Sequence, residues 1–213
     1  MVGKGVLFEC LESSQIESVL VINRASIDIK HEKLKEVIHT DFSNFTSLEE
    51  VLAGYDACFF CLGVSAVGMS EEKYTNITYD LTLRFANTLL KVNKDIIFNY
   101  VSGTGTDSSE KGRSMWARVK GKTENDLMSL PFQKAYMFRP GVIIPQKGIK
   151  SKTPIYNAFY VIFKPLLPVL KSIAPKSVTT TTQVGQAMIK SVTRDYANVY
   201  LENRDINELA TIE

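Results

Sequence analysis

The sequence is poor in cysteine and histidine, which occur three times and twice among 213 residues. Three cysteines at irregular spacing (Cys10, Cys58 and Cys61) exclude the disulfide framework of a small secreted domain. The start of the chain also lacks the charged segment and apolar core of a secretory signal. These absences predict a cytoplasmic location, in a reducing compartment.

A strong charge of either sign is absent as well. The formal net charge is +2, and charges of both signs alternate without a long basic run, so we expect neither nucleic acid nor an anionic membrane surface as a partner. No internal repeat or low-complexity linker divides the chain. With 45% hydrophobic and 23% charged residues, we expect one domain over residues 1–213.

Short apolar segments alternate along the chain with longer amphipathic ones. Several of the short segments are apolar at consecutive positions, which is typical of strands whose two faces are both covered. The pattern predicts an α/β fold: a Rossmann-like, doubly wound, mostly parallel sheet with helices on both faces. The predicted strands are residues 18–23, 36–40, 56–62, 95–101, 134–139 and 197–202, and the predicted helices are residues 3–13, 46–53, 70–92, 113–129 and 181–195.

Several short motifs stand where these strands and helices meet. Gly3 and Gly5 open the first helix, "VINR" ends a strand at Arg24, and "YVSG" ends another at Ser102. "WARVKG" places Lys120 one helical turn after a tryptophan, and "FRPGV" follows a further strand. Together these motifs resemble the short-chain dehydrogenase/reductase superfamily, in its atypical branch that is similar to NAD-dependent epimerases and dehydratases. The resemblance covers nearly the whole chain.

The resemblance implies NADP as the cofactor, with NAD as the alternative. Arg24 stands where an acidic residue would bond the ribose 2′-hydroxyl, and its guanidinium suits a 2′-phosphate. Two alternatives stay open. In one, Arg24 is a solvated loop residue and not a phosphate ligand. In the other, the segment at Asp41 supplies a helix N-cap, at Ser43 or Thr46, and no cofactor contact. The residues expected to bind the cofactor are Gly3, Asn23, Arg24, Asp41, Phe42, Leu62, Gly63, Lys120, Pro140, Gly141 and Val142.

For the chemical step, the resemblance implies a serine, a tyrosine and a lysine. Ser102 would steady a substrate carbonyl, and Lys120 would hold the nicotinamide ribose. The position of the tyrosine is occupied by Trp116, whose indole can donate a hydrogen bond but cannot act as an acid or base near neutral pH. Tyr100 is a candidate replacement, because it shares a side of its strand with Ser102. Trp116 as a packing residue is the alternative.

The expected function is therefore that of an oxidoreductase or epimerase-like protein. Its substrate would be a carbonyl, an alcohol or a nucleotide-sugar-like small molecule. A dinucleotide-responsive binding or scaffold protein without turnover is the alternative, which Trp116 favours. No metal site is expected, since Cys58 and Cys61 would point to opposite faces of a strand and no second ligand pair follows at a suitable spacing.

Two segments add further expectations. Residues 142–180 predict a small substrate or lid region, and within it residues 153–175 carry no acidic side chain. A lid or a homodimer contact is the favoured interpretation of that apolar stretch, ahead of a membrane-surface helix. Before Met1, the resemblance leads us to expect a strand and two glycines. We hypothesise a misassigned start, with a truly truncated product as the alternative. In either case we predict that this chain is poorly soluble and binds NADP weakly.

Overall fold

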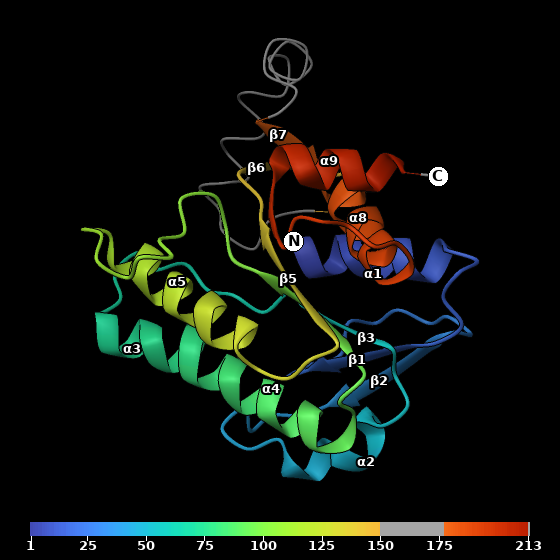
Figure 1. The fold of residues 1–213 in the computed structure, drawn as a ribbon. Coiled ribbons are helices and arrows are strands. Elements are labelled where there is room, and N and C mark those ends of the chain that lie inside the picture. The colour runs from blue at the N-terminus through green and yellow to red at the C-terminus, as the bar shows by residue number, and fades with distance from the viewer. Residues whose placement is uncertain (150–176, 213) are drawn as a thin grey trace.

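The computed structural model describes residues 1–149 and 177–212 (Figure 1). Its helices are α1 (Val2–Glu12), α2 (Glu49–Leu52), α3 (Glu71–Thr75), α4 (Leu81–Val92), α5 (Met115–Met128), α8 (Thr181–Thr193) and α9 (Asn203–Thr211). A 3-10 turn (Thr46–Leu48) precedes α2, and a π-helical segment (Asn76–Asp80) joins α3 to α4. Its strands are β1 (Val19–Asn23), β2 (Leu34–Ile38), β3 (Ala57–Phe60), β4 (Ile97–Val101), β5 (Lys134–Arg139), β6 (Val142–Ile144), β7 (Val178–Thr180) and β8 (Tyr200–Glu202).

Every strand pairing in the described part of the chain is parallel. The strands form three ladders, in the orders β1-β2, β3-β4-β5-β8 and β6-β7. The predicted α/β class with a parallel sheet is confirmed. The predicted single sheet is divided, however, because β1 and β3 carry no ladder between them.

Helices cover both faces of the strands. Figure 1 shows α3, α4 and α5 on one side and α1, α8 and α9 on the other. Alternate side chains of β4 follow this division, since Phe98 and Tyr100 belong to one apolar cluster and Ile97 to the other. The consecutive apolar residues of "IIFNYV" are thereby explained.

The strands differ in how completely they are buried. The first four residues of β4 and the central four of β5 are fully buried, whereas every residue of β1 is only partly buried. In β3, only Phe60 at its end is fully buried. The two strands that lack a ladder between them are therefore less buried than β4 and β5, which lie inside the four-stranded ladder.

Most predicted elements are confirmed within a few residues, but three were not predicted. β6 and β7 pair with each other across the ends of the predicted 142–180 region, and α9 follows β8. Residues 150–176, which include the apolar stretch 153–175, lie outside the described residues. Among the described helices, none combines the length and apolar character that crossing a bilayer demands.

Candidate functional site

A large cavity separates β1 from β3. Its volume is about 1660 Å³, well above that of an ordinary small-molecule pocket. We call it the β1–β3 cavity. Six of the residues predicted to bind the cofactor line it, at the end of the cavity where β1 and β3 terminate: Gly3, Asn23, Arg24, Phe42, Leu62 and Gly63.

The start of α1 reaches this end of the cavity. No side chain caps the helix at Met1, and an atom placed at the Cβ position of Gly3 would lie 3.2 Å from the Cβ of Cys61. A side chain at Gly3 would therefore crowd Cys61, directly after β3, and Cys61 would have to shift slightly to make room. Backbone N–H groups of a helix start, close to strand ends, suit the phosphates of a dinucleotide. The residues present fit that group.

The loop after β1 is held by Glu36 of β2, which was not among the site residues predicted from the sequence. Its carboxylate accepts hydrogen bonds from Ser26 Oγ (2.8 Å), Ile27 N (3.0 Å) and Asn23 Nδ2 (3.3 Å). The Ser26 hydrogen bond is the largest cause of a lowered pKa at Glu36, and those from Asn23 and Ile27 add to it. A lone acidic residue in "LKEVI" was the only signal for this role.

Arg24 projects from the loop that Glu36 organises. Its side chain is exposed, and no acidic group among the described residues pairs with it. Glu36 is committed to the neighbouring loop atoms, which leaves the Arg24 guanidinium open to an anion. Both alternatives for Arg24, solvated residue and phosphate ligand, fit this geometry.

Asp41 does not line the β1–β3 cavity. Its Oδ1 accepts hydrogen bonds from Ser43 Oγ (2.5 Å) and Ser43 N (2.9 Å), and these bonds lower the pKa of the Asp41 carboxyl. The following 3-10 turn begins without a side-chain cap. Asp41 thus stabilises a local turn, and the alternative of an N-cap at Ser43 or Thr46 is wrong.

Ser102 lies in a second group of residues, beyond the end of β4. Its hydroxyl donates to Glu124 Oε1 (2.5 Å), and Glu124 is fully buried on α5. Arg139 forms an ion pair with the same carboxylate and donates from Nε to both of its oxygens at 3.1 Å. The hydroxyl proton of Ser102 is therefore engaged by this ion pair. Glu124, four residues after Lys120, was not among the site residues predicted from the sequence.

Lys120 completes this group. Its ammonium donates to the backbone oxygen of Ser102, and burial lowers the pKa of Lys120 to about 8, against an opposing effect of the Glu124 charge. One turn earlier on α5, Trp116 is half-buried and its ring lies over Gly105, with Cη2 3.5 Å from the Cβ position there. Trp116 belongs to neither apolar core cluster of the described residues, so its packing contacts lie outside the core.

Tyr100 cannot take the role that was predicted for it. Its side chain is 1% exposed and packs in the core, with its ring centroid 6.1 Å from that of Phe60. Burial is the main cause that raises the pKa of the Tyr100 hydroxyl far above its usual range. Tyr100 shares a strand side with Ser102, but that side faces α5 and the core, so the prediction is wrong.

The Arg-Pro-Gly segment packs beside Ser102. The Pro140 carbonyl accepts from Thr104 N (3.1 Å), and Gly141 N donates to Asn203 Oδ1 (3.0 Å). Val142 opens β6 and is 42% exposed. Pro140, Gly141 and Val142 therefore accompany Ser102, Trp116 and Lys120 in a group apart from the β1–β3 cavity, whose lining includes none of them.

The cysteines behave as apolar packing residues. Cys58 packs against one core cluster, whereas Cys10 and Cys61 pack in the other, on the opposite face of the strands. Burial raises the pKa of both Cys10 and Cys61 to about 12, so these thiols stay protonated near neutral pH. The part of the chain that is described holds no cluster suited to a metal ion.

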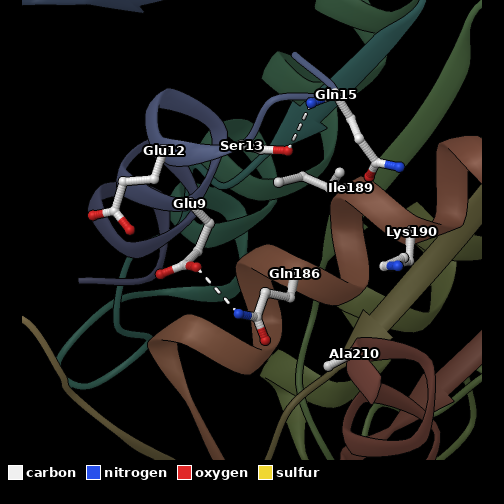
Figure 2. Close-up of a pocket in the computed structure, with 8 residues that line it drawn as sticks. All are labelled: Glu9, Glu12, Ser13, Gln15, Gln186, Ile189, Lys190 and Ala210. Atoms are coloured by element: carbon white, nitrogen blue, oxygen red, sulfur yellow. Dashed lines mark hydrogen bonds between the residues drawn. The ribbon is translucent and has the colours of Figure 1, made fainter. Parts of the chain in front are cut away.

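A smaller pocket of about 360 Å³ lies between α1, α8 and α9 (Figure 2). Figure 2 shows Glu9 facing Gln186 across it, and Glu9 also pairs with Lys147 at 2.6 Å. These bonds satisfy a largely buried carboxylate. The pocket contains none of the predicted residues.

Solved structures define the class of protein to which this fold belongs. The UDP-glucuronic acid 4-epimerase from Bacillus cereus, in complex with NAD, aligns with a TM-score of 0.66 and 13% identity over 95% of this chain and 74% of that chain. A short chain dehydrogenase from Burkholderia cenocepacia, in complex with NADP, aligns with a TM-score of 0.63 and 11% identity over 94% of this chain and 83% of that chain. The chain has the Rossmann-like α/β fold of these short-chain dehydrogenase and epimerase structures, and the predicted resemblance is confirmed at the level of the fold.

Sequence similarity relates the chain more particularly to two groups of proteins. Protein HTATIP2 of Rattus norvegicus is 28% identical over 144 residues, which are 67% of this chain and 58% of that protein. Protein FMP52-2, mitochondrial, of Scheffersomyces stipitis is 26% identical over 139 residues, which are 64% of this chain and 59% of that protein. The chain is thus distantly homologous to them and matches less than two thirds of their length. No family model matches the sequence.

Proposed function

We propose that this protein binds NADP(H), with the adenosine end of the dinucleotide in the β1–β3 cavity. The observation that carries the proposal is the meeting of six predicted cofactor residues at one end of that cavity. Arg24 contacts the 2′-phosphate there, and Gly3 allows the start of α1 to face the pyrophosphate. Lys120 holds the nicotinamide ribose.

Substitution of Arg24 tests the preference for NADP(H). We expect Arg24→Met to weaken NADPH binding about tenfold or more and to leave NADH binding unchanged, because only NADPH offers a charged partner for the guanidinium. Fluorescence titration of both nucleotides measures the two dissociation constants. Arg204→Met, at an exposed arginine on α9, is the matched control. An equal loss for both nucleotides, or no loss, contradicts the role of Arg24.

Binding without rapid turnover is the function that the described residues support best. The dinucleotide supplies a hydride when it is bound, but carbonyl reduction also needs a proton donor. Trp116 cannot donate a proton near neutral pH, Tyr100 is buried in the core, and the Ser102 proton is held by Glu124. Dinucleotide-responsive binding therefore comes first.

Turnover as an oxidoreductase or epimerase-like enzyme is the second candidate. The lowered pKa of Lys120, about 8, favours it, because this ammonium beside Ser102 can release a proton close to physiological pH. The substrate would be a carbonyl, an alcohol or a nucleotide-sugar-like small molecule.

Restoring a tyrosine at position 116 separates the two candidates. We expect no measurable oxidation of NADPH by the wild-type protein with a panel of carbonyl compounds, and turnover above background by Trp116→Tyr. Trp116→Phe, which is aromatic but has no proton to give, should remain inactive. Absorbance of NADPH follows the reaction. If the wild type and Trp116→Tyr oxidise NADPH at equal rates, the proposal of binding without turnover is wrong. The second candidate, an oxidoreductase or epimerase-like enzyme, is then supported.

The cytoplasmic location and the homodimer stay predictions. The FMP52 relatives carry the word mitochondrial in their names, which is said of those proteins. Imaging of the tagged full-length gene product distinguishes the two compartments, and light scattering measures the oligomeric state.

A further inference from the structure

Helices α1 and α8 run side by side in the same direction, with close contacts at two glycines. An atom at the Cβ position of Gly5 would lie 2.6 Å from the Cβ of Thr181, and one at Gly185 would lie 2.5 Å from the Cγ of Glu9. Residue numbers rise together along both helices in these contacts, so the helices are parallel. Beyond Glu9, the two helices border the pocket of about 360 Å³ that Figure 2 shows, which we call the α1–α8 pocket.

Glu9 supplies a buried carboxylate to this pocket. The residue is only 7% exposed. Lys147 Nζ donates to its Oε1 at 2.6 Å, whereas the bond from Gln186 Nε2 to its Oε2 is long, at 3.4 Å. A carboxylate offers about four acceptor sites, so Oε2 can take a further and shorter hydrogen bond from a donor in the pocket.

The charge beside Glu9 is negative. Lys147 Nζ also lies 2.6 Å from Glu12 Oε2, so one ammonium is shared between two carboxylates. The carboxyl-terminal end of α1, which lies here, adds the partial negative charge of its last carbonyl groups. This side of the pocket therefore favours a ligand ammonium over a neutral donor.

The other side of the pocket carries a positive charge. Figure 2 shows Lys190 and Gln15 on the side away from Glu9. None of the carboxylates in the described part of the chain forms an ion pair with Lys190. Lys190 follows Gln186 by one helical turn, about 6 Å along the axis of α8. An ammonium and an amide N–H can both donate to a ligand carboxylate at this distance from Glu9.

The wall between the two charged sides is apolar. Ile189 and Ala210 form it, and Ile189 belongs to one of the core clusters. The volume lies near the lower end of the range for small-molecule sites. A ligand that fits these walls has an ammonium and a carboxylate close together and a short aliphatic side chain.

We propose that the α1–α8 pocket binds a free α-amino acid with a short aliphatic side chain. Its ammonium donates to Glu9 Oε2, its carboxylate accepts from Lys190 and Gln15, and its side chain contacts Ile189 and Ala210. Gln15 and Ile189 also line the β1–β3 cavity, at the end where β1 begins, but Glu9 and Lys190 do not. The two charged groups thus define a site separate from the one proposed for the dinucleotide.

Three ligands that share one aliphatic group test the need for both charges. L-Valine carries an ammonium and a carboxylate, isobutylamine lacks the carboxylate, and isovalerate lacks the ammonium. By isothermal titration calorimetry, we expect saturable binding of L-valine with a dissociation constant of about 1 mM or lower. Each of the other two ligands should bind at least tenfold more weakly, because one charged group of the pocket then stays without a partner.

Two substitutions assign each ligand charge to one side of the pocket. Lys190→Met should weaken L-valine binding about tenfold and leave isobutylamine binding unchanged, because only L-valine has a carboxylate. Glu9→Gln should weaken L-valine and isobutylamine but leave isovalerate unchanged. Lys190 is only partly buried, so the Lys190→Met result stands even where Glu9→Gln unfolds the chain. Lys73→Met, at an exposed lysine of α3 outside the pocket, is the matched control and should bind as the wild type does.

Absence of saturable L-valine binding overturns the proposal. Equal binding of the three ligands does so as well, since it shows that the charges are not recognised. Equal effects of Lys190→Met and Lys73→Met place the ligand elsewhere and also overturn it. No measurement uses a dinucleotide, so the outcome is separate from that of the NADP(H) proposal.

Discussion

At the scale of single residues, glycine 121 decides how α5 lies against the rest of the protein. An atom at its Cβ position would lie 1.8 Å from the backbone oxygen of Asp107. The loop that contains Asp107 also carries Ser108, whose Oγ accepts from Arg139 Nη2 (2.6 Å). The close approach at Gly121 therefore supports the placement of Glu124 and Lys120 beside Ser102.

We expect Gly121→Ala to lower the free energy of unfolding by about 3 kcal/mol, because a backbone atom has to move to make room for the methyl group. Urea denaturation followed by circular dichroism measures the change. Gly63→Ala is the matched control, since no heavy atom lies within 4 Å of its Cβ position. Similar stabilities of the two variants would contradict the close approach.

At the scale of elements, α9 connects the carboxyl-terminal part of the chain to the Arg-Pro-Gly segment. A capping box of Glu202 and Asp205 starts the helix, and Asn203 accepts a hydrogen bond from Gly141 N (3.0 Å). Ile206 and Leu209 are fully buried on one face of the helix. The sequence carries these signals in "ENRDINEL", yet the helix was not predicted, because two apolar residues form too short a periodic pattern.

We expect Asp205→Ala to cost about 1 kcal/mol of stability, because the bonds from Glu202 N (3.1 Å) and Asn198 Nδ2 (2.9 Å) to the Asp205 carboxylate are lost together. Glu208→Ala, on the exposed face of the same helix, should be nearly neutral. Thermal unfolding of both variants measures the difference. If Asp205→Ala unfolds at the wild-type temperature, the cap has no part in the stability of α9.

At the scale of the whole molecule, the separate ladders should unfold at different free energies. The β1-β2 ladder has two strands and only partly buried residues in β1, whereas β4 and β5 lie inside a four-stranded ladder with fully buried centres. Short ladders with exposed backbone edges open locally at low cost.

We expect native-state hydrogen exchange to be at least tenfold faster at Leu20 and Ile22 than at Phe98 and Tyr100. Mass spectrometry or NMR of the exchanging amides gives the rates. Val21, whose backbone faces β2, serves as an internal control and should exchange more slowly than its neighbours. Equal protection at β1 and β4 would show that the ladders open as one unit.

The sequence by itself determined most of the elements, and with them where the candidate site residues stand along the chain. Runs such as "SVLVIN" and "KAYMFR", and the helix that carries Trp116 and Lys120, depend on local propensity and periodicity, which neighbouring residues express directly. Asn23, Arg24, Phe42, Leu62 and Gly63 could be placed at or beyond strand ends, and Gly3 at the start of a helix, because the ends of parallel strands share one edge.

Only the tertiary structure decided which of the candidate side chains are free to contact a substrate or cofactor. The bond between Ser102 and Glu124 joins residues far apart in the sequence, and the burial of Tyr100 depends on which face of β4 meets α5. The two facing edges of the β1–β3 cavity were likewise decided by non-local packing. Sequence periodicity specifies that a strand face is apolar, but it does not specify the residue or strand that will cover it.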